Sequence, residues 1–357
     1  MRIFIIYIIL LNSLLWLTLC KSNTLPTNNK NNKTNSEALI ELGRYFFFDK
    51  RLSYDQGLSC STCHNPNLAF TDGYEVAINS KAENLRRNTP TILNINNRTN
   101  FNWANSKITS LKVQIERPMF GQHPTEMDIS GHEKEILSRF IKDAVYKKLY
   151  KEVFQASINQ ITIPQIIEAI TTYELQLQSR NSRFDQFKKN GDSSLLTDFE
   201  WLGFKIFHAD SIECNACHGG ADFFEPDRGP EFANIGLYNC NQSYPPHDPG
   251  LQEEDGDQDN NGVFRIPTLR NIALTAPYYH DGSEESLIQV IKNYERGGRK
   301  IESGPCKGDG KDHPSKDGRL QVFHLTEYER AALIAFLQTL TDTSYLHKDL
   351  FVDPFKY

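Results

Sequence analysis

Cys60-Ser61-Thr62-Cys63-His64 is the stretch that decides the fold, and its pattern recurs at Cys214-Asn215-Ala216-Cys217-His218. C-x-x-C-H is the attachment signature of a c-type haem: two thiols bind the porphyrin and the histidine binds the iron. A zinc site would need two more soft ligands near each pair, and the flanking sequence offers no second C-x-x-C or H-x-x-x-H. A redox-active cysteine pair would not need the histidine, still less twice. The sequence therefore predicts two covalently attached haems.

The residues before the two motifs form an internal repeat. Leu42-Gly43 and Phe46-Phe47 precede the first motif, and Leu202-Gly203 and Phe207 precede the second. Apolar residues at helical spacing predict that the first of these segments is a helix beginning near Asn35 or Ser36. One unit used twice predicts two cytochrome c-like domains, each holding one covalent haem. The polar segment 181–194 places their boundary, giving domains 37–185 and 186–357.

Other helices follow from periodicity and capping signals. They are expected at 133–154, at 164–177 with Thr162 as the cap, at 283–295, and from Thr326-x-x-Glu329 to Leu340. Segment 255–262 superficially resembles a calcium loop, but it lacks the glycine and glutamate that such a loop needs, so we interpret it as a solvated acidic loop. No run alternates well enough to predict a sheet. The expected fold class is mainly α, with long loops.

Composition limits the function classes. The chain has 357 residues, which favours two domains, and its net charge of −6 gives no basic excess that would indicate nucleic-acid binding. Four of the seven cysteines lie in the motifs, and Cys20, Cys240 and Cys306 remain. Cys240 and Cys306 form either a disulfide, if the protein matures in an oxidising compartment, or two unpaired thiols. The sequence leaves both alternatives open.

The N-terminus predicts export. Met1-Arg2 and the apolar run from Ile3 to Leu19 are typical of a secretory signal over residues 1–20. Leu17-Thr18-Leu19-Cys20 is a loose lipobox, so a lipidated Cys20, an ordinary cleaved signal and an uncleaved anchor all remain open. Residues 21–36, rich in Asn, Thr and Lys, are expected to be a disordered linker. Each alternative places the haem domains outside the cytoplasm, in the periplasm.

The supply of axial ligands makes the two haems unequal. Methionine occurs only at Met1, Met119 and Met127, so no residue after the second motif can provide a methionine ligand. No histidine or methionine lies between His64 and Met119, which favours an open distal face on the first haem. An open face permits chemistry at the iron, whereas two protein ligands favour electron transfer. His123, Met127 and His132 are the rival ligands, and each is more readily explained as a surface or packing residue.

Three longer stretches resemble a known family. Residues 42–53 leading into the first motif, Arg87-Asn88-Thr89-Pro90-Thr91, and residues 269–282 (Leu-Arg-Asn-Ile-Ala-Leu-Thr-Ala-Pro-Tyr-Tyr-His-Asp-Gly) are similar to the bacterial di-haem cytochrome c peroxidase and MauG family. The resemblance runs from about residue 37 to residue 340, with the motifs in the family's order.

The resemblance implies roles for individual residues. His64 would be the proximal ligand of the peroxidatic haem and His218 that of the electron-transfer haem, with Trp103 between them as a relay. A distal pocket over the first haem would be lined by Gln114, Pro118 and Glu126. A calcium ion would be bound by Asn88 and the carbonyls of Thr275 and Pro277. Glu126 also has a physical argument of its own, because cleavage of a peroxide needs a group that takes a proton from one oxygen and delivers it to the other.

Two departures from the usual family pattern bear on function. Peroxidases of this family have a distal histidine shortly before the Arg-Asn-x-Pro motif, and residues 77–86 contain none, so the first haem should be open at rest. The position of the second haem's methionine ligand is occupied by Tyr294, as in MauG-like members. Trp103-Ala104-Asn105 and residues 118–124 are similar to the methanobactin-associated MauG-like type, which oxidises a tryptophan of a partner protein.

These observations support one leading function and two alternatives. The leading hypothesis is reaction with hydrogen peroxide at the first haem, with electrons from a small redox protein such as a cytochrome c or a cupredoxin. The first alternative is MauG-like oxidation of a side chain on a substrate protein. The second is an electron carrier without catalysis, in which both haems are closed.

Overall fold

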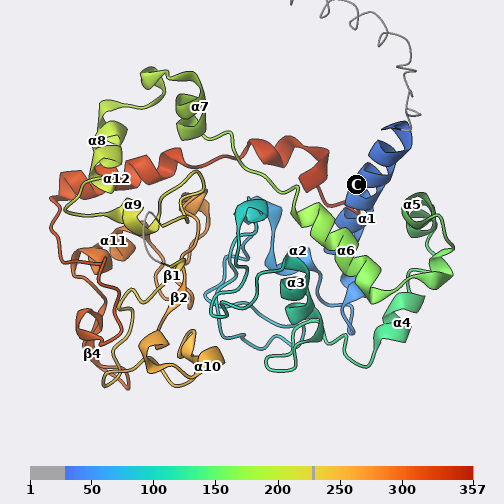
Figure 1. Ribbon diagram of the computed structural model, residues 1–357, viewed down its shortest axis with the longest axis horizontal. Helices are drawn as coiled ribbons and strands as arrows, with labels where there is room; N and C mark the ends of the chain where they lie inside the picture. Colours follow the sequence, from blue (N-terminus) through green and yellow to red (C-terminus); the bar gives the residue numbers. More distant parts are fainter. Residues whose placement is uncertain (1–28, 227–229, 357) are drawn as a thin grey trace, which may run out of the picture.

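The computed structural model describes residues 29–226 and 230–356, and two crossed helix pairs organise it (Figure 1). The first pair is α1 (Asn29–Phe48) with α6 (Ile163–Glu174), and the second is α8 (Asp198–Phe207) with α12 (Glu327–Thr339). The other helices are α2 (Cys60–Cys63), α3 (Leu111–Phe120), α4 (Glu133–Ser138), α5 (Ala144–Phe154), α7 (Arg183–Asn190), α9 (Cys214–Cys217), α10 (Gln252–Asp255) and α11 (Leu287–Glu295). Two small antiparallel ladders pair β1 (Phe232–Ala233) with β2 (Phe264–Arg265) and β3 (Lys300–Ile301) with β4 (Gly308–Asp309). The predicted mainly α fold is confirmed.

A glycine sets the crossing of each helix pair. A Cβ on Gly43 would lie 1.9 Å from the carbonyl oxygen of Ala169, and a Cβ on Gly203 would lie 2.0 Å from that of Ala332. Neither distance is compatible with any side chain larger than hydrogen, so each pair of helices touches backbone to backbone. The match of Gly43 with Gly203 and of Ala169 with Ala332 confirms that the predicted repeat is structural.

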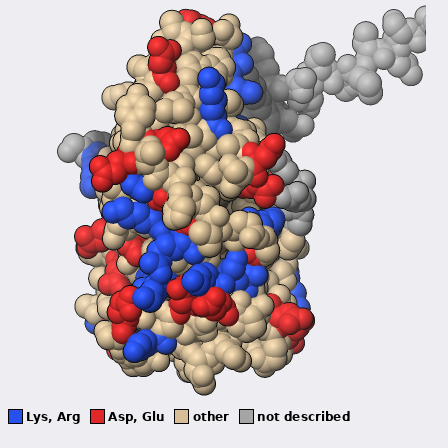
Figure 2. Space-filling model, turned by 90° about the vertical axis from the view of Figure 1, so that its left-hand side faces the viewer, with Lys and Arg blue, Asp and Glu red and all other residues tan. Residues whose placement is uncertain are grey.

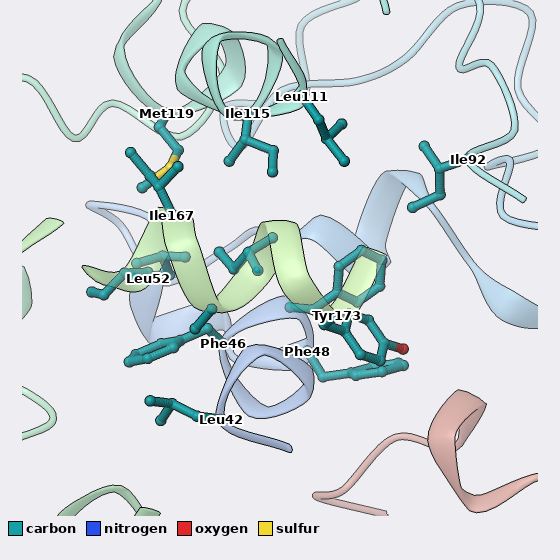
Figure 3. Packing of buried hydrophobic residues seen from close by; sticks show 14 of the residues in the cluster. Leu42, Phe46, Phe48, Leu52, Ile92, Leu111, Ile115, Met119, Ile167 and Tyr173 are labelled. Atoms are coloured by element: carbon teal, nitrogen blue, oxygen red, sulfur yellow. The ribbon is translucent and has the colours of Figure 1, made fainter. Parts of the chain in front are cut away.

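The first core lies between α1, α6 and α3 (Figure 3). Leu42 and Phe46 from α1 pack beneath α6, and Ile115 and Met119 reach down from α3. These four side chains are at most 6% exposed. Burial of apolar area of this kind contributes about 25 cal/mol per Å² to folding. The core therefore fixes α3, which carries candidate site residues on its other side.

The second core contains helix α7, which lies within the segment predicted as the domain boundary. Phe184 of α7 packs on Phe204 and Phe336, with ring centroids 5.8 and 5.4 Å away. The second unit therefore begins before α7, a few residues ahead of the predicted division at 185/186. Gly191 ends α7 in the left-handed conformation.

The end of the chain returns to the first unit, although the sequence assigned it to the second. Tyr345 and Phe351 are 1% and 4% exposed within the first core. The Tyr345 hydroxyl donates to the carbonyl of Pro66 at 3.0 Å. The two halves are joined by this return of the chain and by two ion pairs, Arg87–Asp248 and Arg86–Glu253, each 2.7 Å long.

Three helix predictions need correction. Helix α1 begins at Asn29, so the end of the predicted linker 21–36 is helical. Residues 29–36 contain neither glycine nor proline, the two residues that most disfavour a helix. The predicted helix 133–154 is two helices, since the Asp143 side chain accepts from Val145 N at 2.9 Å and starts a new one. Helix α11 begins at Leu287 rather than near Ser283, because Ser286 is its cap. The predicted caps Thr162 and Thr326 are both confirmed as capping boxes.

The remaining expectations about the chain have mixed outcomes. Cys240 and Cys306 form a disulfide, which settles the open alternative. Asp255, Asp257 and Asp259 are exposed, as expected for a solvated acidic loop. The predicted signal with Cys20 lies outside the described residues. Among the residues that the structure describes, we find no helix with the length and apolar character needed to cross a membrane.

Candidate haem sites

Each C-x-x-C-H motif folds into one helical turn that ends at its histidine. His64 N donates to Cys60 O at 2.8 Å, and His218 N donates to Cys214 O at 2.9 Å. The four motif cysteines form no disulfide in the described part of the chain. Their thiols therefore remain available for the thioether bonds that a c-type haem requires.

The two motif histidines are held in the form that binds a metal. His64 Nδ1 lies 3.1 Å from the carbonyl oxygen of Phe70, and His218 Nδ1 lies 3.1 Å from that of Phe223. A carbonyl only accepts, so Nδ1 carries the proton and Nε2 presents its lone pair. Burial lowers the pKa of both histidines, that of His218 to about 4, so both rings are neutral. This is the state expected of a proximal haem ligand.

A cavity of about 390 Å³ opens at the first motif and gathers the predicted distal residues. Cys60, Cys63 and His64 line it together with Gln114, Pro118, Glu126 and Trp103. Burial raises the pKa of Glu126 to about 7. The carboxyl is therefore divided between its protonated and ionised forms near neutral pH, which suits a group that takes and returns a proton.

Helix α3 and the loop after it position the distal side chains. Gln114 Oε1 accepts from Asn102 Nδ2 at 2.9 Å, which leaves the amide NH₂ of Gln114 as a donor. The carbonyl of Pro118 accepts from Met127 N at 3.0 Å. This bond holds the loop that carries Glu126 against α3.

Trp103 joins the first cavity to the second half of the molecule. Its Nε1 donates to the carbonyl of Asn88 at 2.9 Å, and its carbonyl accepts from Arg265 N at 2.8 Å. Trp103 lines the cavity and also packs on the cluster that contains Tyr244 and Tyr279. Trp103 therefore contacts both halves, and its role as a relay between the haems stays a prediction.

Tyr294 lies beside the second motif. Burial raises its pKa well above the usual value, and the charges of Tyr279, Cys217 and Cys214 act in the same direction. These charges indicate that the Tyr294 phenol lies near both motif cysteines, and its role as a haem ligand stays a prediction. Tyr279 is buried close by, and its hydroxyl accepts from Asn293 Nδ2 at 3.3 Å.

Buried arginines are the functional residues that sequence reasoning missed. Arg265 lines the first cavity, is 3% exposed, and has a buried Nη1 without a hydrogen-bond partner. Burial lowers its pKa to about 10. Burial and the neighbouring Arg265 lower the pKa of Arg98, whose charge also acts on His218. The carboxylate of Glu231 acts on both guanidinium groups, and the propionates of a bound haem would add further negative charge beside them. No motif surrounds either arginine, so the sequence held no signal.

Glu174 is a second residue that the sequence did not single out. It is 5% exposed, lines the first cavity and has its pKa raised to about 8 by burial. The helix pairs match Ala169 with Ala332, so the counterpart of Glu174 in the second unit is Leu337, an ordinary core residue. The first site thus carries a buried carboxyl where the repeat places a leucine.

Glu174 is expected to make stability depend on pH. The folded protein keeps this carboxyl protonated up to pH about 8, whereas an unfolded chain loses the proton near pH 4.5. The unfolded state therefore binds fewer protons between these values, and the free energy of unfolding falls as pH rises, by about 1.4 kcal/mol per pH unit from this group. Glu174→Gln should flatten that slope in urea unfolding of the haem-loaded protein. Glu168→Gln, on the exposed side of the same helix, is the control, and an equal slope in both variants would refute the assignment.

The rival ligands and the predicted calcium residues have clear positions. His132 stacks on Tyr54, with ring centroids 3.5 Å apart, and is not among the residues that line the first cavity. His123 and Met127 do line it, His123 as an exposed residue and Met127 within the first core.

Asn88 N donates to His280 O at 2.7 Å, which brings Asn88 to the segment that contains Thr275 and Pro277. No group of three or more His, Cys, Asp or Glu side chains that could hold a metal occurs in the described residues.

The donor set fits haem at both places. Each site has two thiols and a neutral histidine with Nε2 presented, and the same fold unit supplies this arrangement twice. The class defined by fold and site is therefore a c-type cytochrome with two haems.

Comparison with known proteins places the chain within that class. A sequence profile described as di-haem cytochrome c peroxidase matches residues 37–194. The chain is 30% identical over 306 residues to the methylamine utilization protein MauG of Methylorubrum extorquens, covering 84% of this chain and 77% of the relative. It is also 30% identical over 305 residues to the cytochrome c551 peroxidase of Nitrosomonas europaea, covering 85% and 80%.

A solved structure agrees over almost the whole chain. The crystal structure of a MauG-like protein associated with microbial copper homeostasis has a TM-score of 0.85 and 39% identity, covering 90% of this chain and 94% of the other. The chain belongs to the di-haem cytochrome c peroxidase and MauG family. It is a peroxide-dependent oxidoreductase with two c-type haems, and the expected resemblance is confirmed.

Proposed function

We propose that hydrogen peroxide reacts at the His64 site and that oxidising equivalents are shared with the His218 site through Trp103. One observation carries this proposal: a single cavity contains the first haem motif, Glu126 and Gln114, and reaches Trp103. An electron carrier with two closed haems would have no use for a proton-transferring carboxyl in that cavity.

At the first site, different residues have the roles of holding the haem, transferring a proton and orienting the peroxide. Bound haem supplies the redox-active iron and the coordination position for peroxide. Cys60 and Cys63 would attach the porphyrin, and His64 Nε2 would bind the iron. Ionised Glu126 takes a proton from one peroxide oxygen and delivers it to the oxygen that leaves as water. The Gln114 amide donates toward the peroxide, and the bond from Met127 N to the Pro118 carbonyl keeps Glu126 in place.

The second site is proposed to store and pass electrons. His218 and Tyr294 would be its protein ligands, and a phenolate would stabilise the oxidised form of the iron. Trp103 lies between the sites, where its ring can pass electrons, and Arg265 stands 5.6 Å from that ring. Hydrogen peroxide is a two-electron oxidant, and in this arrangement the His64 and His218 sites together supply the two electrons, one from each site.

A second candidate function is oxidation of a side chain on a partner protein. The specific observation in its favour is the 39% identity to a MauG-like protein over 90% of the chain. The absence of a histidine from residues 77–86 agrees with it. In this version the electrons come from a protein substrate, for example from a tryptophan, rather than from a small redox protein.

Calcium binding and export complete the proposal. Asn88 with the carbonyls of Thr275 and Pro277 is the proposed calcium site, beside a pocket lined by Glu75, Pro277 and Gly282. The periplasm is the proposed location, because the disulfide Cys240–Cys306 suits an oxidising compartment and the N-terminus resembles a secretory signal. Lipidation of Cys20 would add a membrane tether.

Mixing the fully oxidised protein with hydrogen peroxide tests the main proposal. Stopped-flow absorption should show a rapid change in the haem spectrum without prior reduction, because residues 77–86 supply no histidine to close the first site. A dependence on prior reduction would mean that His123 or Met127 closes the first haem. Two low-spin haems with no response to peroxide in either state would leave the electron carrier as the function.

A further inference from the structure

The outer face of the second unit does not identify a partner by charge. Figure 2 views this side of the molecule and shows Lys and Arg interspersed with Asp and Glu. Arg296 and Lys311, for example, both pair with Asp309, at 3.4 and 3.7 Å. A surface of mixed sign does not steer a partner of one sign to one place. The more specific chemistry of this unit lies in its interior.

A cluster of aromatic side chains extends from Trp103 into the second unit. Tyr238, Tyr244 and Tyr279 pack in this cluster together with Trp103. The rings of Tyr238 and Tyr244 meet edge to face, with centroids 5.6 Å apart. The charges of Tyr279 and Tyr244 act on Tyr294, so both phenols lie near the proposed ligand of the second haem. Tyrosine and tryptophan are among the side chains that are oxidised most readily, and the cluster gives an electron from Tyr238 a short route toward the second haem site.

The Tyr238 hydroxyl donates to a carboxylate, Asp281 Oδ2, at 2.6 Å. Burial alone would raise the pKa of Asp281, but His280, Tyr238 and Ser283 lower it, so the carboxylate is ionised at neutral pH. Burial and the charge of Asp281 raise the pKa of Tyr238 to about 12, so the phenol keeps its proton. A phenol that loses an electron becomes a strong acid, and a carboxylate within hydrogen-bond distance is placed to take its proton.

The surroundings of Tyr238 favour a neutral radical over a charged one. The guanidinium carbon of Arg299 lies 4.5 Å from the centroid of the Tyr238 ring, and Arg299 Nη1 is held by Ser283 Oγ at 2.6 Å. A cation over the ring opposes positive charge on it, so the electron leaves only if the proton leaves too. Tyr244 differs, because its hydroxyl donates to the amide oxygen of Asn234 at 3.1 Å, and an amide is a poor proton acceptor. Tyr244 is therefore suited to pass an electron, and Tyr238 to hold the radical.

We propose that Tyr238 is a third holding place for an oxidising equivalent, besides the two haems: it gives one electron through Tyr244 to the oxidised second haem site and its proton to Asp281. This inference rests on the proposed function, since hydrogen peroxide supplies the oxidising equivalents. In the forward step the Tyr238 O–H bond breaks, an O–H bond forms on Asp281, and the second site is reduced by one electron. The reverse step returns the electron and the proton to Tyr238. One oxidising equivalent is thereby kept away from the haems while no external reductant is present.

The test is electron paramagnetic resonance of the haem-loaded protein, frozen rapidly after it is mixed with equimolar hydrogen peroxide in the absence of a reductant. A tyrosyl radical signal should appear, and it should become narrower in protein made with ring-deuterated tyrosine. Tyr238→Phe should abolish this signal and prolong the haem spectrum that peroxide produces, because one source of electrons is lost. Asp281→Asn should slow the appearance of the signal, since a neutral amide takes the proton poorly.

Tyr146→Phe is the matched control. The Tyr146 hydroxyl also donates to a carboxylate, Asp49 Oδ2 at 2.8 Å, but it lies in the first core and outside the cluster around Trp103. Its replacement should leave the radical signal and the haem spectrum unchanged. Haem content and the spectrum before addition of peroxide check that every variant is folded and loaded.

Each outcome has a separate meaning. A tyrosyl signal that persists in Tyr238→Phe, or that disappears in Tyr146→Phe, would place the radical elsewhere and overturn the proposal. Equal rates of signal formation in Asp281→Asn and the unmodified protein would rule out Asp281 as the proton acceptor. If the unmodified protein does not react with peroxide, the proposed function fails. If its haem spectrum responds to peroxide but no tyrosyl radical forms, only the role of Tyr238 is wrong.

Discussion

Replacing Glu126 by glutamine is expected to slow the reaction with hydrogen peroxide by about 10²- to 10⁴-fold. Glutamine keeps the size of the side chain but can neither take a proton from one peroxide oxygen nor return it to the other. The measurement is the second-order rate constant for the spectral change in stopped flow. The haem content per chain should be unchanged, because Glu126 is not part of the attachment motif.

The pH profile provides an independent test of the same residue. Burial raises the pKa of Glu126 to about 7, and only the ionised carboxylate accepts a proton. The rate should therefore rise with pH through about 7 and then level off, and the profile of Glu126→Gln should be flat over that range. Glu116→Gln on the exposed side of α3 is the control and should keep both rate and profile. A full rate in Glu126→Gln would show that another group carries the proton.

Replacing Tyr294 by phenylalanine is expected to open the second haem while leaving both haems attached. Loss of the phenolate removes the sixth ligand, so the second haem should change to high spin in the electron paramagnetic resonance spectrum. Its reduction potential should rise by on the order of 100 mV, since axial ligands set the potential of a haem. Staining for covalent haem on a denaturing gel checks that attachment is intact.

Tyr279→Phe is the matched control for this experiment. It removes a buried phenol from the same cluster, but the charge coupling to Cys214 and Cys217 belongs to Tyr294 and not to Tyr279. The spectrum of Tyr279→Phe should therefore stay close to that of the unmodified protein. If Tyr279→Phe shifts the spin state and Tyr294→Phe does not, the ligand has been assigned to the wrong tyrosine.

The sequence was sufficient where the chemistry is local. The haem turns, the capping boxes at Thr162 and Thr326, and the repeat of Gly43 in Gly203 could be read from short spacings, and all three are present in the fold. The gathering of Gln114, Pro118 and Glu126 in one cavity was expected only from the family resemblance. Gln114 and Pro118 are four residues apart on α3 and therefore share a face of the helix. Glu126 comes from the loop after α3, and no spacing rule places it beside them.

The sequence failed where distant segments determine the environment of a side chain. Arg265 and Glu174 look like ordinary surface residues in the sequence, and only tertiary packing makes them buried. The burial of a charged side chain depends on tertiary packing, so a local sequence pattern does not predict it.

The return of the last residues to the first core has a consequence for biogenesis. The N-terminal unit is synthesised first, yet its core is closed by Tyr345 and Phe351, which are synthesised last. Until they dock, the apolar interior next to Cys60 and Cys63 is incomplete, and the crevice beside those thiols is easier to reach. Docking of the C-terminal segment, in which the Tyr345 hydroxyl donates to the Pro66 carbonyl, is therefore the step that completes the first core.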